Sequence, residues 1–293
     1  MKNNLQTIEV VTFATTSNNL FFKDFSDKLS LLIKNCEELN LKLTIFGLDE
    51  LRDLISKSPF KFNLMFRRGV GAWFWKPIIL KKAIKESRSD FILYLDVDCF
   101  LLKDPLEIIS NSLGNKSFGG FKQNEKLGNW TSKRAIKLLK IGVILADASL
   151  WTAGILVFKK NAESMKFLSI WERGMLNPKV LFEPIRDFRN TRHRHDQVIL
   201  SYLIANGSIE CVDLGSGFYS NGVEGTSSDL SKSWVATGNL DKSVPFIELN
   251  LIQKLTLRLN YSLSIIQFFL YYFFVWPIHR ISYFVYLNRS LKK

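Results

Sequence analysis

The chain of 293 residues is poor in cysteine and histidine, with three of each. Cys36, Cys99 and Cys211 are far apart, odd in number and without the spacing of a zinc site, so we expect reduced core thiols and no disulfide framework. An apolar signal region is also lacking at the N-terminus, which predicts that the protein is not exported and has no N-terminal anchor.

Acidic residues are absent after Glu248, whereas six basic residues follow it. The net charge of the whole chain is +13, which favours an anionic partner such as a nucleotide, a nucleic acid or an acidic lipid. No basic helix, zinc finger or aromatic RNA-binding signature is present, so we do not expect nucleic acid to be the partner.

Apolar periodicity predicts an α/β fold. Residues 8–15 and 41–48 read as strands on either side of an amphipathic helix, whose apolar residues recur at three- and four-residue steps from Phe22 to Leu39. Such a βαβ unit implies parallel strands joined by a right-handed crossover. The same criteria predict helices over 76–86, 129–139, 162–173 and 195–205, a short helix starting at Pro105, and strands over 91–95, 118–121 and 150–160.

The most informative stretch is Asp96-Val97-Asp98, which follows the apolar run 91–95. This run reads as a buried parallel strand, and ligands bind at the carboxyl ends of such strands. Residues two apart on a strand point the same way, so Asp96 and Asp98 could share Mg²⁺ or Mn²⁺, and the cation could hold a diphosphate. The alternative is two solvated carboxylates at a strand end, or Asp98 capping a turn.

Four segments in a fixed order carry a resemblance to a known family. They are Gly-Val-Gly-Ala-Trp-Phe-Trp-Lys-Pro at 69–77, the Asp pair at 96–98, Thr-Ala-Gly-Ile at 152–155 and His-Arg-His-Asp-Gln at 193–197. Over about residues 8–220 the chain resembles bacterial capsule and lipopolysaccharide glycosyltransferases, and more distantly the retaining glycogenin-like transferases. The resemblance implies the GT-A fold, which is Rossmann-like with a mostly parallel central sheet and helices on both faces.

The same resemblance implies roles for individual residues. Asp96 and Asp98 match the pair that binds the metal and the nucleotide sugar. Lys76 matches the basic residue that faces the donor diphosphate, with a solvated lysine at a helix start as the alternative. Asp196 and Gln197 match a catalytic pair in which the Asp binds donor hydroxyls and the Gln lies near the anomeric carbon. The alternative for Asp196 is a carboxylate that caps a helix.

The remaining donor-binding candidates are small or hydroxylated residues. Ala153 and Gly154 match the turn under the donor sugar, where glycine lets the backbone approach a ligand, or they mark a tight strand crossing. Thr12, Ala14 and Thr15 end the first strand, where such folds seat the nucleotide base and ribose.

Aromatic and histidine residues leave alternatives open. Trp73 and Trp75 are candidates to stack on a sugar or base, or to pack in the core. His193 and His195 read as a solvated loop or as metal ligands. The retaining relatives supply a third metal ligand, a His, from a late segment. The corresponding region of this chain, Asp213 to Leu240, contains no His, which leaves Asp213 itself or water in that position.

These observations favour a glycosyltransferase that depends on Mn²⁺ or Mg²⁺. It would move a sugar from a nucleotide-sugar donor to a saccharide or lipid-linked saccharide acceptor in surface polysaccharide biosynthesis. The Asp-Gln pair favours retention, whereas inversion would need Asp196 or Glu183 as general base. A nucleotidyltransferase would need a glycine-rich loop after the first strand, where residues 12–19 contain no Gly. A non-catalytic protein that binds membranes or polyanions stays a third possibility.

Two regions with different tasks are expected. Residues 1–248 would form the catalytic domain, and 249–293 a helical tail that associates with membranes. Within the tail no charged residue occurs from Leu259 to Ile278, and Tyr and Trp are frequent. The tail therefore reads as an interfacial helix on anionic lipid, as a single-pass span, or as a buried helix. The protein would lie on the cytoplasmic side of the inner membrane.

Overall fold

The computed structural model describes residues 6–16, 24–56, 64, 69–181, 193–220 and 233–237, and the account below concerns these. Glu183 and the predicted tail over 249–293 lie outside the described residues. Within the described ranges no helix combines the length and the apolarity that a membrane crossing needs.

The predicted βαβ unit is present at the start of the chain. Strand β1 (Ile8–Phe13) is followed by helix α1 (Ser26–Glu38) and strand β2 (Lys42–Phe46). Strand β1 lies between β2 and β3 (Phe91–Leu95) and is parallel to both. Its side chains alternate between the two faces of the sheet, so Val10 packs on one face and Val11 on the other.

The second half of the sheet reverses direction. Strand β6 (Ser149–Lys159) is antiparallel to β3 on one side and to β5 (Phe118–Lys126) on the other, and β7 (Val212–Asp213) is parallel to β5. The sheet order is β2-β1-β3-β6-β5-β7, with three of five pairings parallel. The predicted mixed α/β architecture is confirmed, but β3 is a parallel strand on one side only.

A second, three-stranded sheet follows the Asp pair and was not predicted. Strand β4 (Cys99–Leu101) pairs antiparallel with β9 (Val235–Thr237), which pairs parallel with β8 (Phe218–Ser220). Residues far apart in the sequence thus meet directly beyond the carboxyl end of β3.

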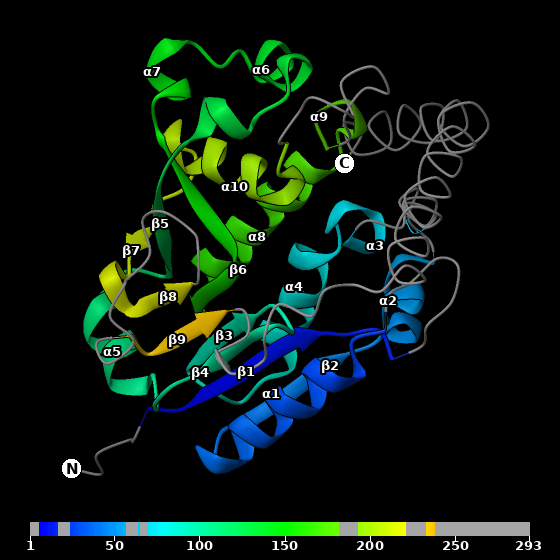
Figure 1. The fold of residues 1–293 in the computed structure, drawn as a ribbon, viewed down its shortest axis with the longest axis vertical. Coiled ribbons are helices and arrows are strands. Elements are labelled where there is room, and N and C mark those ends of the chain that lie inside the picture. The colour runs from blue at the N-terminus through cyan, green and yellow to red at the C-terminus, as the bar shows by residue number, and fades with distance from the viewer. Residues whose placement is uncertain are drawn as a thin grey trace, which may run out of the picture.

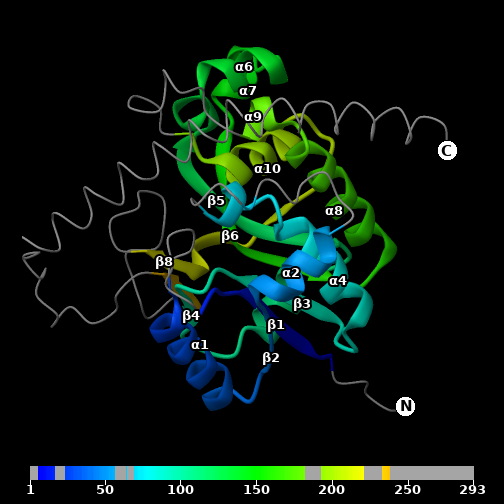
Figure 2. The same ribbon diagram turned by 90° about the vertical axis from the view of Figure 1, so that its right-hand side faces the viewer.

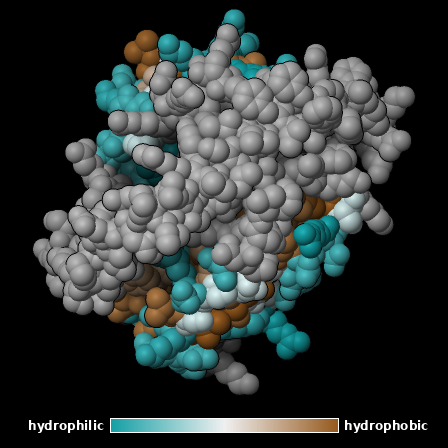
Figure 3. Space-filling view, turned by 45° about the vertical axis from the view of Figure 1, so that its right-hand side comes forward, coloured by the Kyte–Doolittle hydropathy of each residue, from teal (hydrophilic) through white to brown (hydrophobic). Residues whose placement is uncertain are grey.

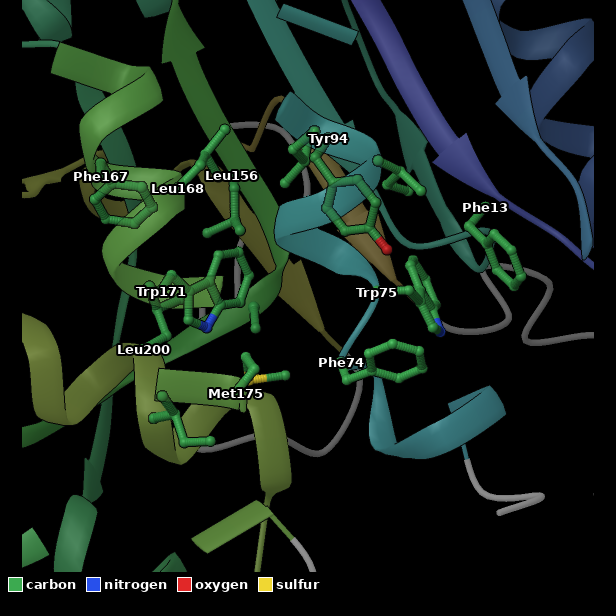
Figure 4. Packing of buried hydrophobic residues seen from close by; sticks show 14 of the residues in the cluster. Phe13, Phe74, Trp75, Tyr94, Leu156, Phe167, Leu168, Trp171, Met175 and Leu200 are labelled. Carbon is green, nitrogen blue, oxygen red and sulfur yellow. The ribbon is translucent and has the colours of Figure 1, made fainter. Parts of the chain in front are cut away.

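Helices cover both faces of the large sheet (Figures 1 and 2). Helix α1, α5 (Leu106–Leu113) and the small sheet pack on one face. The other face carries α2 (Leu48–Ile55), α4 (Lys76–Glu86), α8 (Ala162–Met175) and α10 (His195–Ala205). Figure 4 shows the aromatic core on that face, where Tyr94 of β3 lies between side chains of α8 and the two aromatic residues just before α4, Phe74 and Trp75.

Shorter helices extend this frame. They are α3 (Gly69–Ala72), η2 (Leu127–Trp130), α6 (Lys133–Leu139), α7 (Val143–Ala146), α9 (Pro178–Leu181) and η4 (Gly215–Gly217). The single helix predicted over 129–139 is thus split into η2 and α6. The break occurs because Ser132 is extended and caps α6, its side chain accepting a hydrogen bond from the backbone N–H of Ala135.

Candidate active site

The Asp pair lies just past the end of β3. The strand ends at Leu95, and Asp96 and Asp98 belong to the turn that leads to β4, closed by a hydrogen bond from Cys99 N to Asp96 O (2.8 Å). Strand alternation, on which the sequence argument relied, therefore does not orient these side chains. Both nevertheless line the same pocket.

This pocket has a volume of about 400 Å³. The structure brings into its lining the candidates from all four segments: Lys76, Asp96, Asp98, Ala153, Gly154, Asp196 and Gln197. Residues that the sequence did not single out for binding or catalysis also line it, including Gln123, Trp130 and Arg194.

Lys76 is the central cation of the pocket. It begins α4, but only 2% of its side chain is exposed, so the alternative of a solvated lysine is wrong. Its Nζ lies 2.9 Å from Asp196 Oδ2, 3.1 Å from Asp96 Oδ1 and 2.9 Å from the carbonyl oxygen of Ala153. The Nζ group donates hydrogen bonds to Ala153 O and to Asp96 Oδ2 (3.4 Å), whereas its contact with Asp196 is an ion pair, and Asp196 Oδ2 has no hydrogen-bond partner among the described residues.

The charges of this cluster support one another. Burial alone would lower the pKa of Lys76, but the carboxylates of Asp196 and Asp96 raise it above its ordinary value, so the ammonium stays charged. Burial raises the pKa of the Asp196 carboxyl, and Lys76 opposes that shift. With both carboxylates ionised the cluster carries one net negative charge, which a bound cation would offset.

Asp96 is held from several sides. Tyr94 donates its hydroxyl hydrogen to Asp96 Oδ1 (2.5 Å), and Asp96 N donates to Gly154 O (2.7 Å). A Cβ on residue 154 would lie 2.7 Å from Asp96 Oδ2, so the Asp96 carboxylate would have to move. Glycine at this position therefore allows the Asp96 carboxylate to approach the backbone of β6, whatever it does for a ligand.

Asp98 is the more open of the two carboxylates. Its side chain is 44% exposed against 31% for Asp96, and its one ion-pair partner among the described residues is Lys28 of α1, at 3.5 Å. Such a half-exposed pair at long distance is weak, so Lys28 would not prevent Asp98 from binding a cation. The sequence contained no signal that α1 delivers this lysine.

Asp196 and Gln197 lie in the first turn of α10 and are buried. The position of Asp196 suits the positive end of the helix dipole, and its carboxylate also faces Lys76. Gln197 donates from Nε2 to Gln123 Oε1 of β5 (3.0 Å). The amide of Gln197 is therefore held in place at the wall of the pocket.

The two histidines at the start of α10 are buried, not solvated. Ser132 N donates to His193 Nδ1 (3.2 Å), so His193 Nε2 is the donor to Val180 O (2.9 Å). Both ring nitrogens of His193 are thus used by the backbone. His195 lines the pocket, and its Nδ1 contacts Leu181 O at 2.7 Å. In the described part of the chain no three His, Cys, Asp or Glu side chains group to hold a metal.

The glycine-aromatic segment ahead of Lys76 is a left-handed turn. Residues 69 to 73 all have positive φ, at 59°, 49°, 91°, 58° and 59°. Glycine adopts this region freely, whereas Val70, Ala72 and Trp73 are strained there. The turn directs Trp73 into the pocket lining, with its ring centroid 5.9 Å from Lys76 Nζ.

The two tryptophans of this segment have different surroundings. Trp75 packs in the core against Phe13, with ring centroids 4.1 Å apart, as Figure 4 shows. Its indole N–H donates to Gly69 O (3.0 Å). Core packing is therefore the structural role of Trp75, and Trp73 is the one available to a ligand.

Like Trp75 and His193, four further candidates are not among the residues that line this pocket. Thr12 donates its hydroxyl hydrogen to Leu95 O (2.8 Å) and thereby ties β1 to β3. Ala14 and Thr15 are buried just beyond the end of β1. Asp213 belongs to β7, and its Oδ1 accepts a hydrogen bond from Gly215 N (3.1 Å).

Comparisons with known proteins give distant structural likenesses only. No family model matches the chain, and no curated protein matches its sequence. Mouse xyloside xylosyltransferase 1 is 11% identical with a TM-score of 0.49, over 82% of this chain and 100% of that one.

Two further solved structures are similarly distant. The bifunctional glycosyltransferase WbbM is 15% identical with a TM-score of 0.47, over 80% of this chain but only 46% of its own. The galactosyltransferase LgtC, solved with donor and acceptor sugar analogues, is 12% identical with a TM-score of 0.43, over 87% and 95%. At these sequence identities and TM-scores the comparisons carry no argument about function, so the evidence for function is the side chains of the pocket.

Proposed function

We propose that this chain is a glycosyltransferase that uses a nucleotide-sugar donor. The observation that carries the proposal is the buried Lys76, ion-paired to both Asp96 and Asp196 in one pocket with the half-exposed Asp98. A diphosphate leaving group needs cationic stabilisation, and a sugar needs fixed hydrogen-bond acceptors for its hydroxyls. Asp96 and Asp98 would hold the cation that stabilises the diphosphate, and Asp196 would accept hydrogen bonds from the sugar. Lys76 joins the two sides of the pocket.

The donor set fits a hard divalent cation. Asp96 and Asp98 would hold Mg²⁺ or Mn²⁺, since both ions prefer carboxylate oxygens and Mg²⁺ keeps several waters while binding one or two carboxylates and substrate phosphates. A third protein ligand is thus not required, and Asp213 need not bind the metal. When bound, the cation would neutralise charge on the diphosphate.

Lys76 would position the site as much as touch the donor. Its Nζ already donates to Asp96 and Ala153 and is ion-paired to Asp196, so its ammonium sets the separation of Asp96 from Asp196. We propose that this fixes the distance between the diphosphate and the sugar. Ala153 and Gly154 form the floor at that point, and the residues at the end of β1, Thr12, Ala14 and Thr15, stay candidates for the nucleoside.

The geometry around Asp196 favours retention over inversion. A general base must collect the proton of the acceptor hydroxyl, but the Asp196 carboxylate is buried and already engaged by Lys76. In the retaining reaction we propose, the acceptor oxygen bonds to the anomeric carbon, the bond from that carbon to the phosphate oxygen breaks, and the departing phosphate takes the proton. Asp196 would hold donor hydroxyls and Gln197 would lie beside the anomeric carbon.

The acceptor we propose is a saccharide or lipid-linked saccharide of surface polysaccharide biosynthesis. Trp73 and Trp130 line the pocket, and aromatic rings are the side chains on which sugars stack. The basic, aromatic residues 249–293 would hold the enzyme on the cytoplasmic side of the inner membrane. Truncation after Glu248 should then preserve donor binding and lower activity on a lipid-linked acceptor.

A panel of nucleotide sugars tests the proposal. The expected result is that one donor, with Mn²⁺ or Mg²⁺ present, raises the melting temperature and is slowly hydrolysed. Asp98→Asn should abolish both effects, whereas Asp53→Asn, on the exposed side of α2, should keep them. A protein that binds and hydrolyses no donor, or that works equally well in chelator, would contradict it.

A further inference from the structure

Helices α6 and α7 and their connections (residues 131–148, the α6–α7 hairpin) lie together at one end of the molecule (Figures 1 and 2). The hairpin is firmly anchored. Ile141, between the two helices, is buried, and its N–H donates to Ile136 O (2.9 Å). Gly128 of η2 packs so closely that an added Cβ would lie 3.0 Å from Ala146 Cβ. The hairpin therefore presents a fixed surface.

The tip of the hairpin is apolar and exposed. Val143 is 80% and Ile144 is 88% exposed, the highest values for large hydrophobic residues in the described chain. Figure 3 shows a small hydrophobic group among hydrophilic residues at this end of the molecule. A single exposed apolar residue needs no explanation, but two adjacent ones on an anchored turn do.

The surroundings of the tip are basic. Lys133, Lys137 and Lys140 are exposed beside it, and Arg134 is partly exposed. The one acid of the hairpin, Asp147, is neutralised by Lys126 at 2.7 Å. The hairpin thus combines an apolar tip with three exposed lysines.

We propose that the α6–α7 hairpin docks on an anionic membrane surface. Val143 and Ile144 would enter the headgroup boundary while the lysines meet anionic lipid. A protein partner fits less well, because lysine is depleted in protein interfaces and a specific interface needs about 800 Å² on each side. Docking would bring the pocket to the membrane surface, since α6 follows η2, whose Trp130 lines that pocket.

A spin label tests the contact directly on the full chain. In Ile144→Cys carrying a nitroxide, vesicles of phosphatidylcholine and phosphatidylglycerol should raise the accessibility of the label to oxygen and lower that to an aqueous nickel complex. The same label at Leu31→Cys, 65% exposed on α1, should not respond. If the chain sediments with vesicles while the accessibility of the label at 144 stays unchanged, the proposal is overturned. It is also overturned if the accessibility changes without vesicles when the protein concentration is raised, because that result indicates a protein partner.

Paired variants measure the contribution to binding. Val143→Ser with Ile144→Ser, and separately Lys137→Glu with Lys140→Glu, should each lower the vesicle partition coefficient about tenfold. Leu31→Ser with Lys34→Glu, an exposed pair on α1, should leave it within about twofold. Equal losses in all three would overturn the proposal. Binding is measured without substrate, so this outcome is independent of the proposed transferase activity.

Discussion

Among the residues that the structure describes, the buried cluster around Glu9 and the one around Lys76 are built differently. Glu9, in the first half of β1, is 3% exposed and accepts hydrogen bonds from Lys42 (2.8 Å), Thr44 (2.6 Å) and Ser87 (2.6 Å). Burial would raise the pKa of Glu9, but these partners lower it below its ordinary value. The cluster is neutral and its carboxylate has enough donors.

The Lys76 cluster has one ammonium for two carboxylates and opens into a pocket. Burial raises the pKa of Asp196, the reverse of the shift at Glu9. Buried charge is therefore not by itself a sign of function. An excess of one sign beside a cavity is the feature that points to a ligand of the opposite sign.

The largest difference is expected when each lysine is removed. Lys76→Met leaves the buried Asp196 carboxylate without its counter-charge and beside the partly exposed Asp96, and should lower the free energy of unfolding by about 3 kcal/mol. Lys42→Met should cost only about 1 kcal/mol, because Lys42 is 60% exposed and Thr44 and Ser87 still donate to Glu9. Urea unfolding in chelator measures both, and equal losses would contradict the comparison.

Removing carboxylate charge should separate activity from stability. Asp96→Asn should lower turnover at least about 10³-fold while changing the free energy of unfolding by less than about 1 kcal/mol, because Lys76 keeps Asp196 as its partner.

Glu9→Gln is the matched variant. It should leave turnover unchanged and cost about 1–3 kcal/mol of stability, because an amide has one acceptor oxygen where the two oxygens of the buried carboxylate accept from three donors. Steady-state rates with the identified donor, beside urea curves, decide the point. If Asp96→Asn keeps normal turnover, the Lys76 cluster has a structural role like the Glu9 cluster.

A smaller effect is expected from the hydroxyl that holds Asp96. Tyr94→Phe should weaken metal-dependent activity by about 10–100-fold, because the Asp96 carboxylate loses one of the groups that orient it. The metal concentration for half-maximal activity is the readout, and it should rise. Thr44→Val, which removes the corresponding hydroxyl from Glu9, should leave that concentration unchanged.

The smallest effect is a difference in pH dependence. The lowered pKa of Glu9 contributes stability above the unfolded value of 4.5 that is lost as pH falls through the folded pKa. The raised pKa of Asp196 works oppositely, contributing most below its unfolded value of 3.8 and less as pH rises through the folded pKa.

The stability advantage of the wild type over Glu9→Gln should therefore shrink on acidification, and that over Asp196→Asn should grow. Urea midpoints measured from about pH 3 to 7 test both signs. If both stability differences change with pH in the same direction, the folded protein stabilises the Asp196 carboxylate as it does that of Glu9.

Local pattern was enough for much of the fold. The helices predicted over 76–86 and 195–205 are α4 and α10 with the same bounds, because apolar periodicity, and for α4 a first-turn proline, act within a few residues. The βαβ unit was readable for the same reason. The order of the motifs also selected most residues that line the pocket.

Contacts between distant segments decided the rest. The direction of β6, the small β4-β9-β8 sheet and the burial of Lys76 depend on which strand meets which, and residues 76, 96 and 196 come together only once those pairings exist. A lysine at the start of a helix can be solvated or can lie between two carboxylates. Residues far away in the sequence decide which of the two occurs. Periodicity in the sequence carries no information about those neighbours, because it records only which face of an element is apolar.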